Sequence, residues 1–214
     1  MDIFQVHGFE LSDTETHQFE TLLSLFIDYN SHTNLSAIRD EEGIVVKHFI
    51  DSLYGAALIQ DWLSDVSHAP RLLDIGSGWG FPGIPLKIVM SELQVILLDS
   101  VGKKVKAMNH FIEHLWLQNI SALQERAEIL AKNPLHKGQY DIITSRATAY
   151  ITDILTWAVP FLAPEGSIVL YKMPSDEEQK DREKILKKLS LTLEWELEYE
   201  IAWKKRIIYL IKRK

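Results

Sequence analysis

The chain contains no cysteine and no long apolar run, and both absences narrow what it can be. Without cysteine, disulfide bonds, thiolate metal sites and a cysteine nucleophile are excluded, and the absence fits a reducing cytosol. The first residues lack the basic start and continuous apolar stretch of a signal peptide, and no segment has the roughly 18 apolar residues that a membrane span needs. We therefore expect a cytoplasmic protein without a membrane partner.

Basic residues are also in short supply. The 23 Lys and Arg residues are outnumbered by 30 Asp and Glu, which gives a net charge of −7 at pH 7. Nonspecific binding to a polyanion is disfavoured, because such binding depends on clustered cations that release counterions. A nucleic-acid partner would need a local basic patch. Three short runs qualify, although each also fits a solvated face or a helix end: "GKKVK" with Lys103, Lys104 and Lys106, Lys204 to Arg206, and Lys212 to Lys214.

The composition is that of a folded protein, and the N-terminal residues have a helical pattern. The chain has 214 residues, of which 46% are hydrophobic and 25% charged, enough for one large domain with a small appendage. Apolar residues recur at helical spacing over residues 12–28, after the capping signals of Ser12 and Asp13, and again over residues 40–59. We predict that residues 1–65 form a helical cap packed on a main domain of residues 66–214.

After Pro70 the sequence pattern changes to short apolar runs that alternate with helical segments. This alternation predicts an α/β fold with a parallel sheet and right-handed crossovers. The predicted strands are residues 71–75, 94–98, 120–123, 140–144 and 167–171, and the predicted helices between them are residues 82–89, 101–117 and 151–159.

The tail breaks that alternation. After a charged helix, two β-rich runs, residues 191–201 and 206–213, are separated only by "AWKK", which is too short for a parallel crossover, so the pair must be antiparallel. The first run predicts a half-buried strand with one apolar face. A Rossmann-like, mostly parallel sheet that ends in an antiparallel hairpin is typical of class I methyltransferases that use S-adenosylmethionine (AdoMet). NAD-binding Rossmann folds normally continue with parallel strands.

The segment "LLDIGSGWGFPGIPL" leads from the first predicted strand into a helix and fits two cofactor motifs. Residues 78–83 match the dinucleotide pattern GxGxxG, whereas residues 74–80 match the D-x-G-x-G-x-G loop of AdoMet enzymes. Asp74 favours AdoMet, because a carboxylate beside the glycines would repel a pyrophosphate and is compatible with a cationic ligand. Asp99, at the end of the second strand, suits the ribose hydroxyls of either cofactor and also a helix N-cap.

Six segments occur in an order that is specific to one family: "NLSAIRD", "HFIDSL", the glycine-rich loop, "LLDSVGKKVKAM", "RAE" and "YDIITSRA". Together they resemble the bacterial small-subunit (16S) ribosomal RNA guanine-N7 methyltransferases, also called glucose-inhibited division protein B, and the resemblance is good over residues 33–171. It implies that AdoMet contacts the glycine loop at Gly76 and Gly78 and four further residues, with Asp99 at the second-strand acid position. Those four are Phe81, Ala127, Glu128 and Arg146.

The chain departs from the family pattern at two places. Trp79 stands where the family usually has a small residue or proline, which could reshape the mouth of the pocket. "YKMP" replaces a frequent Lys-Gly after the fifth strand, which puts the role of Lys172 in question.

Guanine N7 carries an unprotonated lone pair, so its methylation needs no general base, and we predict neither a catalytic acid or base nor a metal. Catalysis should consist mostly of positioning. His48 and Asp51 are three residues apart on a predicted helix, a spacing that more often indicates a local pair or packing than acid/base chemistry.

In A-form RNA the N7 edge is hidden, so the target must be a loop, bulge or extruded nucleotide. The candidate RNA contacts are Arg39, Lys103, Lys104 and Lys172, with Arg146 at the same rim.

Two alternatives remain at this point. An AdoMet enzyme that acts on a small molecule or a protein would fit the acidic net charge and should have a closed pocket without a basic rim. An NAD-linked or non-enzymatic Rossmann protein should continue its parallel sheet. The partner implied by the resemblance is 16S ribosomal RNA or the small ribosomal subunit, and we expect a monomer. The nucleotide that is methylated stays open.

Overall fold

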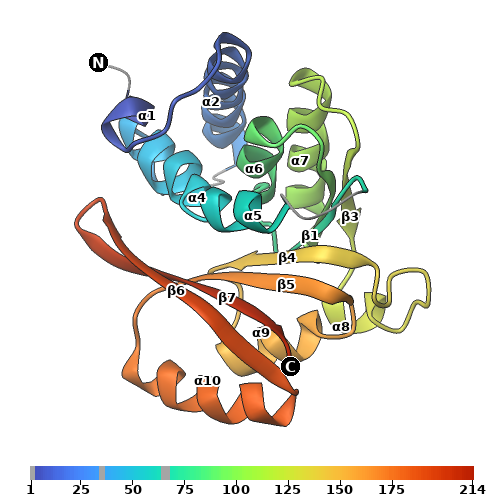
Figure 1. The fold of residues 1–214 in the computed structure, drawn as a ribbon. Coiled ribbons are helices and arrows are strands. Elements are labelled where there is room, and N and C mark those ends of the chain that lie inside the picture. Colours follow the sequence, from blue (N-terminus) through green and yellow to red (C-terminus); the bar gives the residue numbers. More distant parts are fainter. Residues whose placement is uncertain (1–2, 34–36, 64–67) are drawn as a thin grey trace.

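The computed structural model describes residues 3–33, 37–63 and 68–214 and contains a seven-stranded sheet between two layers of helices (Figure 1). The strand order is β3-β2-β1-β4-β5-β7-β6, and β7 runs in the direction opposite to that of the other six strands. The order reverses between β1 and β4, which places a ligand site at the carboxyl ends of these strands. The predicted fold class is confirmed. The strands are β1 (Arg71–Ile75), β2 (Gln94–Asp99), β3 (Ile120–Gln124), β4 (Tyr140–Arg146), β5 (Leu162–Lys172), β6 (Leu191–Ile201) and β7 (Lys204–Arg213).

The helices of the N-terminal third lie on one face of the sheet, above it in Figure 1. Helix α2 (Asp13–Thr33) begins with the predicted capping signal, since Glu15 Oε2 accepts from the backbone N–H of Ser12 at 2.7 Å. The ring of Phe26 on α2 lies 5.6 Å from that of Phe81 and 6.2 Å from that of Phe111. The N-terminal helices therefore share one hydrophobic core with the sheet. The other helices of this layer are α1 (Ile3–Val6), α3 (Glu41–Ile44), α4 (Asp51–Leu53), α5 (Ala56–Leu63), α6 (Gly83–Val89) and α7 (Gly102–His114).

The second layer covers the other face with α8 (Ala127–Leu130), α9 (Ile151–Ala158) and α10 (Asp176–Lys188). Ser175 caps α10 by accepting from the backbone N–H of Glu178 at 3.3 Å. The predicted boundary near residue 65 stays a prediction, because residues 64–67 lie outside the described part of the chain.

The helical character predicted for residues 40–59 is confirmed, but the segment is not one regular α-helix. Asp40 caps α3, but a π-helical turn, η1 (Val45–Ile50), follows before α4, and the chain turns at Tyr54 and Gly55 before α5 begins. Gly55 sits where the hydroxyl of Tyr171 approaches the backbone, and a Cβ there would come within 2.2 Å of that oxygen. Tyr171 uses the same hydroxyl to donate to the carbonyl of Ser52 at 2.8 Å. The turn at Tyr54 and Gly55 therefore lets the chain between α4 and α5 pack closely against Tyr171 of β5.

The predicted single apolar face of the strand at residues 191–201 is also wrong. The register shifts between Leu193 and Trp195, so that Glu194 is an extra residue in β6. Before this bulge the apolar side chains join the core under α9 and α10, and after it they join the core under α2 and α4. Trp195 lies at the change of face and its surface is 59% exposed.

Candidate functional site

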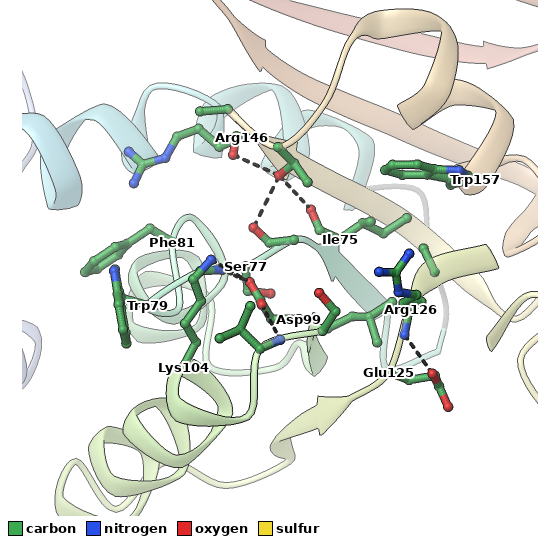
Figure 2. A pocket seen from close by; sticks show the side chains of 18 of the residues that line it. Ile75, Ser77, Trp79, Phe81, Asp99, Lys104, Glu125, Arg126, Arg146 and Trp157 are labelled. Carbon is green, nitrogen blue, oxygen red and sulfur yellow. Dashed lines mark hydrogen bonds and ion pairs between the residues drawn. The ribbon is translucent and has the colours of Figure 1, made fainter. Parts of the chain in front are cut away.

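A cavity of about 510 Å³ opens at the carboxyl ends of β1 to β4 (Figure 2). It lies at the reversal of strand order, where open α/β sheets bind ligands. Every residue predicted to contact the cofactor lines it. The lining consists of His48, Ile75, Gly76, Ser77, Gly78, Trp79, Phe81, Leu98, Asp99, Ser100, Val101, Lys104, Glu125, Arg126, Ala127, Glu128, Arg146, Ala147, Thr148 and Trp157.

The glycine loop is tied to the sheet by hydrogen bonds to carbonyl groups of β1 and β2. The N–H of Gly76 donates to the carbonyl of Leu98 at 2.8 Å, and the hydroxyl of Ser77 donates to the carbonyl of Asp74 at 2.7 Å. Gly76 and Gly78 have φ values of 71° and 61°, a region that disfavours other residues. The two glycines face different surroundings. A Cβ at Gly76 would lie 2.2 Å from Thr148, whereas a Cβ at Gly78 would meet nothing within 4 Å. Gly78 is thus the glycine that borders open space.

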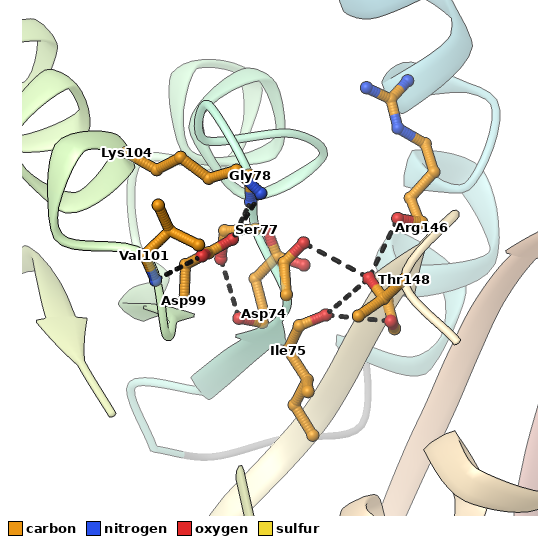
Figure 3. A network of polar contacts seen from close by, with 11 residues as sticks. Asp74, Ile75, Ser77, Gly78, Asp99, Val101, Lys104, Arg146 and Thr148 are labelled. Carbon is orange, nitrogen blue, oxygen red and sulfur yellow. Dashed lines mark hydrogen bonds and ion pairs between the residues drawn. The ribbon is translucent and has the colours of Figure 1, made fainter. Parts of the chain in front are cut away.

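Asp99 anchors this loop and the start of α7 (Figure 3). Its Oδ2 accepts from the backbone N–H of Gly78 at 2.9 Å and from Lys104 Nζ at 3.3 Å, and its Oδ1 accepts from the N–H of Val101 at 2.9 Å. Lys104 therefore faces the cavity as the partner of Asp99, while Lys103 next to it is exposed. The alternative reading of Asp99 as the N-cap of α7 is wrong, because Val101 holds that position.

Asp74 lies beneath the loop, and its side chain is fully buried. Its Oδ2 accepts from the N–H of Gly83 at 3.1 Å and its Oδ1 accepts from the hydroxyl of Thr144 at 3.0 Å. Burial raises the pKa of this carboxyl to about 6. Asp74 thus lies close to the glycines, as predicted, but it does not line the cavity: this acid fixes the loop to α6 and β4.

Phe81, His48 and Arg146 are stacked at one end of the cavity. The rings of His48 and Phe81 are 5.1 Å apart and nearly parallel, and the Arg146 guanidinium lies 5.6 Å from the Phe81 ring. Burial, with Arg146 and Lys47 nearby, lowers the pKa of His48 to about 3. The imidazole is consequently neutral near pH 7 and does not supply a proton there.

Arg146, the last residue of β4, is held by the π-helical turn and by Asp51. Its Nη1 lies 2.8 Å from Asp51 Oδ2 and 3.3 Å from the carbonyl oxygens of Lys47 and His48. The hydroxyl of Tyr199 donates to Asp51 Oδ1 at 2.8 Å. Asp51 therefore joins the N-terminal helices to β4 and β6, so its role is to fix Arg146.

A second cavity, of about 580 Å³, lies on the other side of Arg146 and shares four lining residues with the first: His48, Arg146, Ala147 and Thr148. Its remaining lining includes Lys47, Lys204 and Arg206. Thr148 at the shared wall donates to the carbonyl of Arg146 at 3.0 Å (Figure 3). Arg206 belongs to one of the three basic runs noted in the sequence, whereas the sequence did not single out Thr148 or Trp157 as site residues. Thr148 lies two residues after Arg146 in "SRATAY", so its distance from a predicted site residue was the available signal.

The predicted RNA contacts are not equivalent in the structure. Arg39 and Lys103 are exposed. Lys172 lines the second cavity, but its Nζ lies 2.7 Å from Glu178 Oε1 and donates to the carbonyl of Ala149 at 2.9 Å. Its contribution is thus mainly to hold α10 against β5.

The described residues offer neither a metal centre nor a membrane-spanning helix. Among these residues there is no group of three or more His, Asp or Glu side chains placed to hold a metal ion. Within the same ranges, no helix combines the length and the apolar character that crossing a membrane requires.

A parallel sheet that ends in an antiparallel hairpin, with a glycine loop after β1 and an acid at the end of β2, is the class I AdoMet-dependent methyltransferase fold. Solved structures agree. A ribosomal protein L11 methylase from Lactobacillus delbrueckii subsp. bulgaricus superposes with a TM-score of 0.60 at 15% identity, over 78% of this chain and 79% of that one. A SAM-dependent methyltransferase from Aquifex aeolicus gives 0.54 at 18% identity, over 75% and 90%.

Sequence comparison is more specific. The profile of the family described as GidB, rRNA small subunit methyltransferase G, matches residues 15–196. A protein named ribosomal RNA small subunit methyltransferase G from Acetivibrio thermocellus is 37% identical, over 96% of this chain and 84% of its own length. One of the same name from Roseiflexus sp. is 41% identical, over 75% and 69%. The chain belongs to the rRNA small subunit methyltransferase G family. Membership confirms the family predicted from the motifs, the methyltransferase class and AdoMet as the cofactor.

Proposed function

We propose that this protein transfers the methyl group of AdoMet to N7 of a guanosine in 16S ribosomal RNA. The observation that carries this proposal is the pair of cavities that meet at Arg146, one beside the glycine loop and one beside a group of cations. We propose that the protein acts in the cytoplasm as a monomer, on 16S ribosomal RNA or the small ribosomal subunit.

The first cavity suits AdoMet by size and by chemistry. Its volume falls within the range of small-molecule sites. Asp99 offers carboxylate oxygens to hydroxyl groups, and the open space at Gly78 lets a ligand approach the backbone. AdoMet, when bound, supplies a methyl group on a positively charged sulfur. Ala127 and Glu128 would border its opposite end.

The second cavity is the place for the target nucleotide. It is lined by Lys47, Lys204 and Arg206, which suits an anionic polymer. In the part of the chain that the structure describes, Nη1 of Arg206 is buried and has no hydrogen-bond partner, so an acceptor on a bound nucleotide would satisfy it. The base must leave its stack to enter, as bases do in other enzymes that modify them.

The side chains at the shared wall position the reactants. No proton has to be removed from N7, which agrees with a neutral His48 and with an Arg146 already held by Asp51. The stacked His48 and Phe81 give the wall a flat apolar surface that excludes water. Holding the donor and acceptor in line is the main contribution that these residues can make.

Calorimetric titration with AdoMet and with NAD tests the first cavity. AdoMet should bind and NAD should not. Asp99→Asn removes a charged acceptor and should weaken AdoMet binding about 10- to 100-fold. Glu92→Gln, which changes an exposed acid before the amino end of the same strand, is the matched control and should bind normally. Binding of NAD alone would overturn the cofactor assignment.

The substrate is tested by incubating the purified protein with labelled AdoMet and unmodified 16S RNA, or with small subunits from a strain that lacks the gene. Mass spectrometry of the nucleosides should then detect 7-methylguanosine. Label in a different nucleoside, or no label with either substrate while AdoMet binds, would contradict the substrate proposal and leave the cofactor site standing.

A further inference from the structure

The tip of the β6–β7 hairpin exposes a tryptophan that the fold does not use. The surface of Trp203 is 96% exposed, more than that of any other large hydrophobic side chain in the described part of the chain. Trp203 and Ala202 form the two-residue turn, with φ values of 61° and 48°. Such turns favour Asn-Gly, because residues with a Cβ are strained at positive φ. Neither burial nor turn geometry explains a tryptophan here.

The hairpin tip lies on the side of the sheet where the parallel strands end and where the two cavities open. The last residue of β5, Lys172, pairs with Ile207, so residues 204–206 of β7 extend past the carboxyl end of β5. In Figure 1 the end of the hairpin projects beyond β4 and β5. Ala202, Lys204 and Arg206 line the second cavity, and Trp203 lies between two of them in the chain. A nucleotide next to one held in that cavity would therefore come within reach of Trp203.

The cations near the tip are divided between the two faces of β7. Lys204 and Arg206 alternate along β7 and both line the cavity, whereas Lys205 points to the opposite face and lies across from Glu200. Two cations thus face the cavity, and the turn that precedes them carries an exposed aromatic ring. Proteins that bind single-stranded nucleic acid use this combination, in which bases stack on the ring and cations contact the phosphates.

We propose that the tip of this hairpin binds an unpaired RNA nucleotide that flanks the target guanosine, with its base stacked on Trp203 and its phosphate contacted by Lys204. This inference rests on the proposed RNA substrate and adds a binding surface to it. It also explains why the turn carries a tryptophan at a position that favours glycine.

Fluorescence anisotropy with a labelled single-stranded RNA and with a blunt duplex of the same sequence tests the proposal on the full-length protein. Trp203→Ala should weaken binding of the single strand about 5- to 150-fold, and Trp203→Phe should keep most of the affinity because it keeps a ring. Duplex binding should change little. Trp116→Ala is the matched control: this tryptophan is 83% exposed, also has a positive φ of 53°, and lies in the connection before β3, at the opposite edge of the sheet.

The lysine contact has its own matched pair. Lys204→Gln should reduce the slope of log affinity against log salt by about 0.7, the value for one phosphate contact on a single strand. Lys205→Gln, one residue further and on the opposite face, should leave the slope unchanged. Equal slopes for the two variants would remove the phosphate contact from the proposal.

The outcomes separate this inference from the proposed function. If the protein methylates RNA and Trp203→Ala binds the single strand as well as Trp116→Ala does, the hairpin proposal is wrong and the function stands. If the wild-type protein binds AdoMet but binds and methylates no RNA, the substrate proposal itself fails. Weaker binding to small subunits with unchanged binding to RNA would assign the tip to a ribosomal protein, which also overturns the stacking proposal.

Discussion

His48 shows how one partly buried side chain makes stability depend on pH. Its pKa is lowered from 6.5 to about 3 in the folded protein, first by burial and then by the nearby Arg146 and Lys47. Between these two pH values the unfolded chain binds a proton at this position and the folded protein does not. Stability from the neutral ring is therefore complete above about pH 6.5 and is lost as the pH falls toward 3.

His48→Phe keeps a ring beside Phe81 and removes the titration. The free energy of unfolding of the wild type should fall more steeply than that of the variant between about pH 6.5 and 3, by roughly 3–5 kcal/mol over the whole range. Urea denaturation at a series of pH values measures both curves, and the carboxylates common to both proteins cancel in the difference. Parallel curves would show that His48 is not held neutral.

At the scale of single elements, the hairpin turn allows a test of whether stability is lost in favour of RNA binding. Replacing Ala202 with Asn and Trp203 with Gly gives the turn the residues that its geometry favours, so the free energy of unfolding should rise by about 1 kcal/mol. Thermal denaturation measures this gain. The same protein should bind single-stranded RNA as weakly as Trp203→Ala. A double variant that is less stable than the wild type would mean that Trp203 contributes packing that its exposure does not indicate.

The positions of helices and strands were predictable from the sequence where apolar residues follow a regular pattern along the chain. The strand β1 was predicted with its observed bounds, and β2, β3 and β4 within two residues, because both faces of a parallel strand are apolar. The bulge at Glu194 was not predictable, since one inserted residue leaves the alternation of the sequence intact while it reverses the faces. The π-helical turn at residues 45–50 was not predictable for a similar reason, because its apolar spacing also fits an α-helix.

The site was predictable in its location and less so in its details. The motif placed Asp99 and the glycines correctly at the cavity, because strand ends and a glycine loop define a position in the fold. The direction of a side chain depends on partners that are distant in sequence. Asp74 turns to Gly83 and Thr144, and Lys172 to Glu178, and no local pattern indicates either contact.

At the scale of the whole molecule, the N-terminal helices complete the hydrophobic core. Leu22 and Phe26 are fully buried, and Phe26 contacts Phe81 beside the cavity. A chain that begins at residue 66 would keep α6 and α7 on that face but would expose the apolar side chains that α2 covers, Phe81 and Phe111 among them. We expect this fragment to lack a cooperative thermal transition by circular dichroism and to bind no AdoMet, because Phe81 and Arg146 lose their supports. A fragment that unfolds cooperatively and binds AdoMet would show that residues 1–65 are a separable cap.

The bulge in β6 has a mechanical consequence for the molecule. Edge strands are commonly the first part of a sheet to detach, and an exposed edge invites pairing with another chain. Because β6 contributes Leu191 to one core and Ile201 to the other, peeling it away would expose apolar side chains in both layers at once. One extra residue thus anchors the edge strand in both cores, and detaching it costs more than detaching an edge strand that packs on one layer alone.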